Sequence, residues 1–269
     1  MLGHPWVLVL GCTVGAGGAI ASRVLTDTEL GVIGVHRGNH PEEAAALQAL
    51  AQAHGRECVL IQGDAGRLEN IPALLSQIQE ALQGRPIRLM VHACADASAA
   101  PIVHEQAPKR LHPKQILKTF EVMAHSFLFW GQSLVVEGLM EKNGQLLALP
   151  NTMDELVAST FCAVGAAKAA LSMYVRYMAV ELGPHGVRVN GLRFGATPTP
   201  AFSRMPTYEA TLSTMRAINP MGRTTEVQDV ANFVMLLLDP RSGWLNGSII
   251  DFDGGEHLAV GEFLFGQRA

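Results

Sequence analysis

A glycine-rich stretch near the start of the sequence has the composition of a phosphate-binding turn. Gly11, Gly15 and Gly17 lie in the stretch GCTVGAG, which follows an apolar run and precedes a helical pattern. Glycine permits tight turning and close approach of a ligand to the backbone, and a helix N-terminus attracts a pyrophosphate. The spacing is GxxxGxG, whereas the common dinucleotide fingerprint is GxGxxG. The stretch therefore predicts a dinucleotide site only if a strand–helix alternation surrounds it.

The residues that follow the next two predicted strands are expected to bind the adenosine half of such a cofactor. After the second strand, an acidic residue binds the ribose hydroxyls of NAD, whereas an arginine accommodates the extra phosphate of NADP. Here His36 and Arg37 follow the strand, so the sequence favours NADPH, with NADH as the alternative. Arg37 could also be a solvated loop residue. Asp64, after the third strand, could accept a hydrogen bond from an adenine amino group or cap the next turn.

Two cations occupy positions where a specific contact is expected. Lys168 is the single charge in the stretch VGAAKAA of a long helical pattern. An Ala-rich helix tolerates lysine anywhere on its surface, which is the alternative to a specific contact. Arg193 ends a predicted strand and could either clamp an anionic substrate or form a structural ion pair.

The elements that must position these residues alternate along the chain, as short apolar runs and longer helical patterns. This alternation predicts a Rossmann-type α/β fold, a doubly wound parallel sheet in one domain spanning residues 1–269. The irregular segments Ala95–His112 and Phe194–Arg223 are expected to wall the substrate pocket beyond the strands' carboxyl ends. The predicted strands are Val7–Leu10, Gly31–Val35, Cys58–Gln62, Ile87–His92, Gln145–Leu149, Val187–Leu192 and Ser248–Phe252. The predicted helices are Ala19–Leu25, Pro41–His54, Ile71–Leu82, Pro113–Met140, Thr160–Leu182 and Glu226–Leu238.

Composition and charge exclude several classes of protein. Net charge is −4 and no basic run is present, which argues against a nucleic-acid partner. No run approaches the roughly 18 apolar residues of a membrane span, and the start lacks the basic n-region of a signal peptide. Four scattered cysteines without a CxxC indicate reduced thiols in a cytoplasmic protein, with no metal site. Charged residues are only 16% of the chain, below the usual ~25%, so either the core is large or another subunit covers some surface.

The chain resembles the short-chain dehydrogenase/reductase family almost from end to end. The resemblance rests on the glycine turn, on Asp64, on GPHGVRVN at Gly183–Asn190, on Gly195 and Thr199 with Phe194 in place of a proline, and on the C-terminal DGG at 253–255. Within the family, Gly165–Asn190 and Ala124-His125-Ser126 look most like the enoyl-acyl-carrier-protein reductases, while His36-Arg37 looks like pteridine reductases. The resemblance implies these cofactor-binding residues: Gly11, Thr13, Gly15, Ala16, Gly17, His36, Arg37, Asp64, Ala65, His92, Ala93, Lys168, Gly195 and Thr199.

The catalytic positions that the resemblance implies are altered. The family uses a tyrosine as proton donor and a lysine four residues later, which holds the nicotinamide ribose. Lys168 matches the lysine, but Val164 stands four residues before it. Phe161 stands seven before it, where the enoyl reductases have their tyrosine. Both positions share the helical face of Lys168, so the resemblance keeps the geometry and loses the hydroxyl.

Other positions of the family's relay differ as well. Met123 replaces the catalytic-helix asparagine, Asn151 stands where many members have serine, and HACA at 92–95 replaces NNAG. The candidate catalytic residues are therefore Lys168, Asn151, Thr152, Phe161 and Arg193, with His125 a weaker candidate. Tyr174 and Tyr177 lie well round the helix from Lys168 and are interpreted as packing or interface residues.

These observations leave open what the chain does. The leading hypothesis is an NADP(H)-dependent oxidoreductase with an atypical site, reducing an enoyl or carbonyl small molecule. The alternatives are a catalytically silent homologue, which binds nucleotide or supports a partner subunit, and non-redox chemistry on the same fold. Members of the family commonly form tetramers, so the low charge is interpreted as surface covered in a homotetramer.

Overall fold

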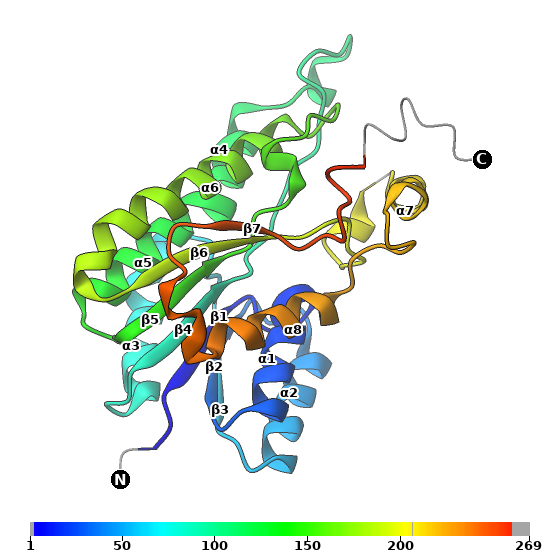
Figure 1. The fold of residues 1–269 in the computed structure, drawn as a ribbon. Helices are drawn as coiled ribbons and strands as arrows, with labels where there is room; N and C mark the ends of the chain where they lie inside the picture. Colours follow the sequence, from blue (N-terminus) through cyan, green and yellow to red (C-terminus); the bar gives the residue numbers. More distant parts are fainter. Residues whose placement is uncertain (1–2, 206, 260–269) are drawn as a thin grey trace.

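The computed structural model describes residues 3–205 and 207–259, in which parallel strands alternate with helices (Figure 1). The strands are β1 (Trp6–Leu10), β2 (Gly31–His36), β3 (Cys58–Gln62), β4 (Ile87–His92), β5 (Met140–Ala148), β6 (Arg188–Arg193) and β7 (Ile249–Asp251). The helices are α1 (Gly15–Asp27), α2 (Pro41–Ala53), α3 (Ile71–Leu82), α4 (Pro113–Phe120), α5 (Ser126–Val136), α6 (Cys162–Leu182), α7 (Tyr208–Ile218) and α8 (Val227–Leu238). The sheet order is β3-β2-β1-β4-β5-β6-β7, with every neighbouring pair parallel. The predicted doubly wound parallel fold is confirmed.

The helices form two layers, one on each face of the sheet (Figure 1). Side chains alternate between the faces along a strand, and β1 shows the consequence. Leu8 and Leu10 pack into a core with α3, α5 and α6, whereas Val7 and Val9 pack into a second core with α1, α2 and α8. Since both faces are covered, β1 is apolar and buried along its whole length.

Two helical predictions are wrong in detail. The pattern Pro113–Met140 is not one helix: α4 leads through a π-helical turn at Glu121–His125 into α5, and β5 already begins at Met140. Gly138, with φ +65°, supplies the left-handed residue that reverses the chain between α5 and β5. The segment Phe194–Arg223, predicted as irregular, contains α7. This helix buries only Leu212 and Ile218. Two buried residues are too few to give a recognisable helical pattern in a segment rich in prolines.

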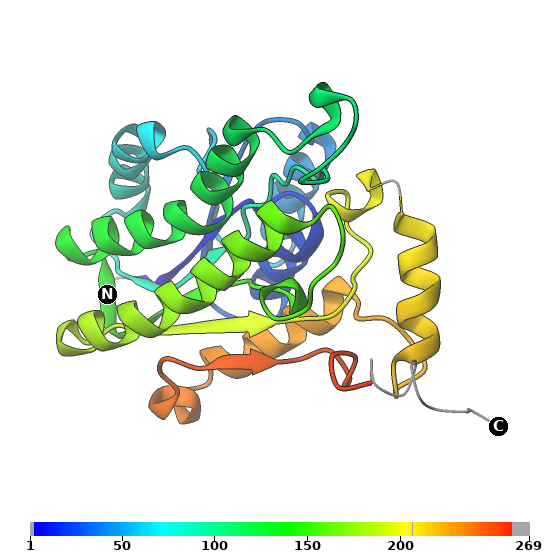
Figure 2. The same ribbon diagram turned by 90° about the horizontal axis from the view of Figure 1, so that it is seen from above.

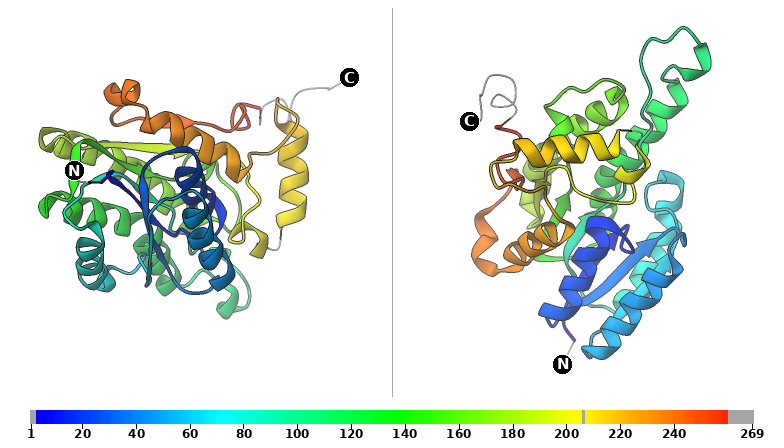
Figure 3. Two further views of the ribbon diagram at one scale, coloured as in Figure 1. Left: turned by 90° about the horizontal axis from the view of Figure 1, so that it is seen from below. Right: turned by 90° about the vertical axis from the view of Figure 1, so that its right-hand side faces the viewer.

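The carboxyl ends of all strands lie at one edge of the sheet, and the strand order reverses between β1 and β4. In such sheets ligands bind in the crevice outside this point. Helix α7 lies beyond the same edge, outside both helix layers (Figures 2 and 3). The loops that carry the predicted site residues therefore lie at this one edge of the sheet. Within the described residues, no helix combines the length and apolar character needed to cross a bilayer.

Candidate nucleotide-binding and active site

The glycine turn joins β1 to α1 at the carboxyl edge. Gly11 and Gly15 have φ of +91° and +61°, in the region that favours glycine. A Cβ on Gly11 would lie 2.8 Å from the Ala93 carbonyl oxygen, and one on Gly17 would overlap the Gly11 carbonyl oxygen. Helix α1 has neither a side-chain cap nor an acidic residue in its first turn, so its first N–H groups and positive dipole end can receive a pyrophosphate. The remaining predicted residues of this turn are Thr13 and Ala16.

The segment after β6 lies against this turn. A Cβ on Gly15 would contact the Thr199 side chain at 3.6 Å, so two of the predicted cofactor segments face each other. Gly195 packs on the carboxylate of Glu256, whose Oε1 accepts a hydrogen bond from the Ala196 N–H at 2.8 Å. A Cβ at residue 195 would lie 2.7 Å from this carboxylate, so a larger residue there requires the Glu256 side chain to shift.

Lys168 is buried, with 6% of its surface exposed, on the face of α6 that meets the sheet. Its Nζ donates a hydrogen bond to the Leu149 carbonyl oxygen, just beyond β5, at 2.7 Å. Burial lowers the pKa of this ammonium to about 8, against the opposing effect of the Asp154 carboxylate. The charge of Lys168 also depresses the pKa of His92 at the end of β4. Lys168 is therefore a buried cation whose Nζ is fixed by a hydrogen bond, close to the point where the strand order reverses. It is not a surface residue of the helix.

An apolar cluster surrounds the helix positions that would carry a tyrosine. Val164 is buried against Met123 of the π-helical turn, together with Val122 and Ala167. Phe161, immediately before α6, is partly buried against the same cluster. Neither predicted tyrosine position holds a group that can donate a proton, and both lie in an apolar environment.

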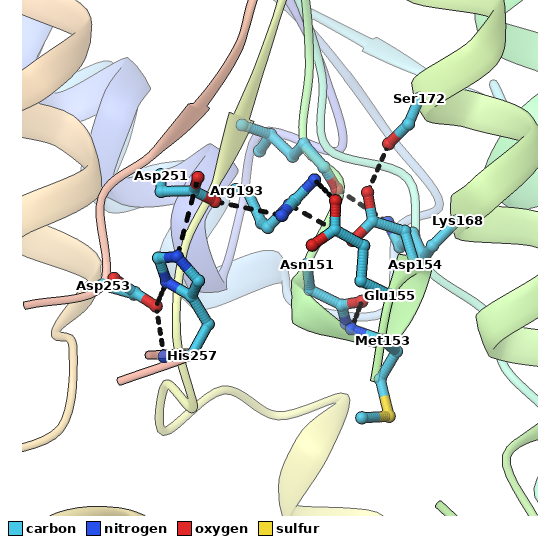
Figure 4. A network of polar contacts seen from close by, with 11 residues as sticks. Asn151, Met153, Asp154, Glu155, Lys168, Ser172, Arg193, Asp251, Asp253 and His257 are labelled. Atoms are coloured by element: carbon cyan, nitrogen blue, oxygen red, sulfur yellow. Dashed lines mark hydrogen bonds and ion pairs between the residues drawn. The ribbon is translucent and has the colours of Figure 1, made fainter. Parts of the chain in front are cut away.

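Asn151 and Thr152 lie in the turn that follows β5. Asn151 forms a backbone bridge with Phe194, and its Oδ1 accepts a hydrogen bond from the Met153 N–H at 3.2 Å (Figure 4). Thr152 begins the short 3₁₀ turn Thr152–Asp154. This hydrogen bond points the side-chain oxygen of Asn151 toward the backbone of Met153. The side-chain NH₂ group of Asn151 therefore points away from that backbone and can donate to another group.

Arg193, which is buried, is the centre of an ion-pair network with the buried Asp154 and with the more exposed Glu155 and Asp251 (Figure 4). Its guanidinium lies 3.2 Å from Asp154 Oδ1, 2.8 Å from Glu155 Oε1 and 3.2 Å from Asp251 Oδ1. Each guanidinium nitrogen thus faces a carboxylate of this chain. Of the two predicted roles for Arg193, these contacts match the structural ion pair.

The network extends to both sides of Arg193. The Ser172 hydroxyl donates a hydrogen bond to Asp154 Oδ2 at 2.6 Å, and burial raises the pKa of this carboxyl group. On the other side, His257 Nδ1 lies 2.6 Å from Asp253 Oδ2, while its Nε2 lies 3.8 Å from Asp251 Oδ2. The turn after β5 is thereby tied to α6 and to the segment after β7.

The two central histidines are engaged within the protein. His92 Nε2 lies 2.7 Å from the Ser126 hydroxyl, which itself donates to the Val122 carbonyl oxygen at 2.8 Å. Burial lowers the pKa of His92 to about 3, so the ring is neutral and packs at the strand end. His125 Nδ1 contacts the Tyr174 hydroxyl at 3.0 Å, which turns this histidine toward a neighbouring part of α6.

The residues after β2 meet those after β4. Arg37 Nη1 lies 3.3 Å from Asp96 Oδ2, and Lys118 Nζ of α4 lies 2.9 Å from the same oxygen. His36 Nδ1 accepts a hydrogen bond from the Gly38 N–H at 3.3 Å. Arg37 is therefore present at the predicted place, paired with a carboxylate that sequence reasoning did not single out.

The predicted adenine-side residues follow β3. Asp64 Oδ1 accepts a hydrogen bond from the Gly66 N–H at 3.0 Å, so it caps this turn, as the alternative interpretation expected. The Ala65 carbonyl oxygen accepts a hydrogen bond from Trp130 Nε1 at 2.8 Å. A carboxylate can accept several hydrogen bonds, so this contact does not prevent Asp64 from accepting one from a ligand as well.

Comparison with protein families identifies the relationship. The family model described as "Enoyl-(Acyl carrier protein) reductase" matches residues 14–257. The chain belongs to this short-chain dehydrogenase/reductase family. The resemblance stated from the motifs is thereby confirmed.

Members of this family with assigned names match at low identity. The chain is 31% identical over 135 residues to an enoyl-(acyl-carrier-protein) reductase (NADH), FabI, of Escherichia coli (strain K12), which is 50% of this chain and 52% of that protein. It thus spans about half the length of this relative. The chain is 24% identical over 240 residues to a 1-cyclohexenylcarbonyl-CoA reductase of Streptomyces collinus, which is 87% of this chain and 81% of that protein.

Solved structures of short-chain dehydrogenases/reductases share the fold. One from Serratia marcescens BCRC 10948 has a TM-score of 0.81 at 20% identity, covering 95% of this chain and 99% of that one. A 7α-hydroxysteroid dehydrogenase complexed with NADH and 7-oxo glycochenodeoxycholic acid has a TM-score of 0.83 at 24% identity, covering 94% of each chain. At these identities the likeness shows the fold alone.

Proposed function

We propose that this short-chain dehydrogenase/reductase is an NADP(H)-dependent oxidoreductase that reduces an enoyl or carbonyl group of a small molecule. The observation that carries the proposal is Lys168, a buried ammonium held by the Leu149 carbonyl beside the crevice. A buried lysine at this place has a cost in solvation that a purely structural residue would avoid. The charge is explained if it contacts a polar ligand in the crevice.

The residues around the crevice fit a nicotinamide nucleotide. The uncapped start of α1 and the close approach of Gly11 and Gly17 leave backbone N–H groups for a pyrophosphate. Arg37 at the end of β2 suits the extra phosphate of NADP, and Lys168 would orient the nicotinamide ribose. When bound, NADPH supplies the hydride.

The apolar cluster favours an enoyl substrate over a ketone. Hydride addition to a ketone leaves an alkoxide that needs a proton from a nearby acid, whereas addition to an enoyl thioester leaves a delocalised enolate. Hydrogen-bond donors are sufficient to stabilise an enolate, and water can protonate it later. Asn151, Thr152 and the ammonium of Lys168 are the candidate donors. The names of the matched relatives, an enoyl-(acyl-carrier-protein) reductase and a 1-cyclohexenylcarbonyl-CoA reductase, agree with this substrate class.

One observation favours a second candidate function. An apolar cluster occupies the positions where the family has its catalytic side chains; it includes Val164, Phe161 and Met123. A protein that keeps the nucleotide site without these catalytic side chains could bind NADPH without turnover, as a nucleotide-binding or partner subunit.

Titration of the purified protein with NADPH, followed by a panel of enoyl thioesters, ketones and pterins, separates these functions. The proposal expects NADPH binding and NADPH consumption with enoyl thioesters, which Lys168→Ala abolishes. Lys142→Ala is the matched control, because Lys142 is an exposed lysine at the opposite end of β5. Binding without turnover on the whole panel would support the silent homologue, and failure to bind NADPH or NADH would refute both functions.

We further propose that the protein is a homotetramer. Helices α5 and α6 carry apolar side chains that the chain itself leaves exposed, including Phe129, Met173, Tyr177 and Val180 at 39%, 45%, 63% and 76%. A covered face of this kind accounts for the low share of charged residues.

A further inference from the structure

One carboxylate holds two cations across the proposed nucleotide crevice. Asp96 follows β4, Arg37 follows β2, and these two strands flank β1 on either side. β1 lies between β2 and β4 (Figure 1). The Arg37–Asp96 pair therefore spans the carboxyl end of β1, where the glycine turn begins. Lys118, from α4, contacts the same carboxylate oxygen of Asp96.

The geometry of these three residues suits a phosphate. Arg37 Nη1 and Lys118 Nζ contact the same Asp96 oxygen at 3.3 and 2.9 Å, so the two nitrogens lie within about 6 Å of each other. A phosphate group can contact two cationic donors at this separation with different oxygens. The three side chains are 40%, 48% and 29% exposed for Arg37, Lys118 and Asp96, so a ligand from solvent can reach them.

The charges are unbalanced in favour of an anion. Two cations and one carboxylate leave a net charge of +1. Exposed ion pairs contribute little to stability, so Asp96 can be replaced as the partner of Arg37 without loss of the fold. The Asp96 carboxylate would keep its negative charge and repel a phosphate placed beside it.

We infer that Lys118 is a second ligand of the nucleotide's 2′-phosphate and that Asp96 is an anion that the phosphate must displace, which sets the preference between NADPH and NADH. This inference rests on the proposed nucleotide binding. It assigns to Asp96 a specificity-determining role: the residue holds Arg37 and Lys118 together in the free protein and opposes the 2′-phosphate.

Two small probes isolate the 2′-phosphate, since adenosine 2′,5′-bisphosphate and 5′-AMP differ only in that group. Their affinities are measured by calorimetry for the wild type, Lys118→Met, Asp96→Asn and the control Lys114→Met, an exposed lysine one turn earlier on α4. We expect Lys118→Met to weaken binding of the bisphosphate about fivefold and Asp96→Asn to strengthen it about fivefold. Binding of 5′-AMP and the control variant should stay unchanged within about twofold.

The outcomes distinguish this inference from the proposed function. If 5′-AMP and NADH bind but Lys118→Met affects both probes equally or neither, the second-ligand role is refuted while nucleotide binding stands. If Asp96→Asn weakens the bisphosphate, Asp96 supports the site instead of opposing the phosphate, and its assigned role is wrong. If no nucleotide binds to the wild type, the proposed function fails and the inference fails with it.

Discussion

Replacing Lys168 by methionine should change the pH dependence of stability in a defined way. The pKa of this ammonium falls from 10.5 to about 8 in the folded protein because of burial. Between these values the unfolded chain binds more protons than the folded one, so wild-type stability rises with pH in this window. Below about pH 8 the ammonium is charged in both states, and its burial penalty is constant.

The size of the effect follows from the same two pKa values. They differ by about 2.5, and one pKa unit corresponds to about 1.4 kcal/mol, so the penalty at neutral pH is on the order of 3 kcal/mol. Methionine removes this penalty but also the hydrogen bond to the Leu149 carbonyl oxygen, whose loss costs about 1–3 kcal/mol. Lys168→Met should therefore be as stable as the wild type at neutral pH, or up to about 2 kcal/mol more stable.

The assay is urea unfolding of both proteins at about pH 7 and about pH 9.5. Other titrating groups are common to the two proteins, so they cancel in the difference. The wild type should gain about 2 kcal/mol relative to Lys168→Met between these pH values. A difference in unfolding free energy that does not change with pH would refute the burial of a charged Lys168.

Three further changes probe the network, the turn and the assembly. Arg193→Met should destabilise the fold by about 3–5 kcal/mol in urea unfolding, because it leaves the Asp154 carboxylate buried without its cation. Gly17→Ala should lower the melting temperature and abolish measurable NADPH binding, because the new Cβ overlaps the Gly11 carbonyl oxygen. Tyr177→Glu should convert a homotetramer to smaller species in light scattering, by placing a charge on the exposed apolar face of α6.

Matched controls define what would contradict these expectations. Arg241→Met removes an exposed arginine in a surface pair, and a loss of stability equal to that of Arg193→Met would contradict the importance of the buried network. Gly243→Ala adds a methyl group in open space and should leave NADPH binding intact. A wild-type monomer at micromolar concentration would refute the proposed tetramer.

The strands and the cofactor turn were predictable because their signals are local. Runs such as Cys58–Gln62 and Ile87–His92 are apolar and short, and the predicted bounds match β3 and β4. Arg37 was identified by its place directly after the second strand, and Lys168 because it is the single charge in an Ala-rich stretch. The π-helical turn at Glu121–His125 was not predictable, because the helical spacing of apolar residues continues through it.

The ion pairs were beyond sequence reasoning for a physical reason. Asp154 and Arg193 are separated by a whole helix, and Asp96 meets Arg37 only because β2 and β4 flank β1. Such contacts depend on the strand order. The acidic residues involved lie in irregular segments without a distinctive spacing, so no local pattern marks Asp96 as a partner.

The central claim is that this short-chain dehydrogenase/reductase reduces an enoyl group with NADPH. The most direct measurement is NADPH consumption with an enoyl thioester, compared between the wild type and Lys168→Ala, with identification of the product. The account predicts a saturated thioester formed by the wild type, and no product from Lys168→Ala. An NADPH-saturated wild type that forms no saturated product, or a Lys168→Ala variant with undiminished turnover, would contradict it.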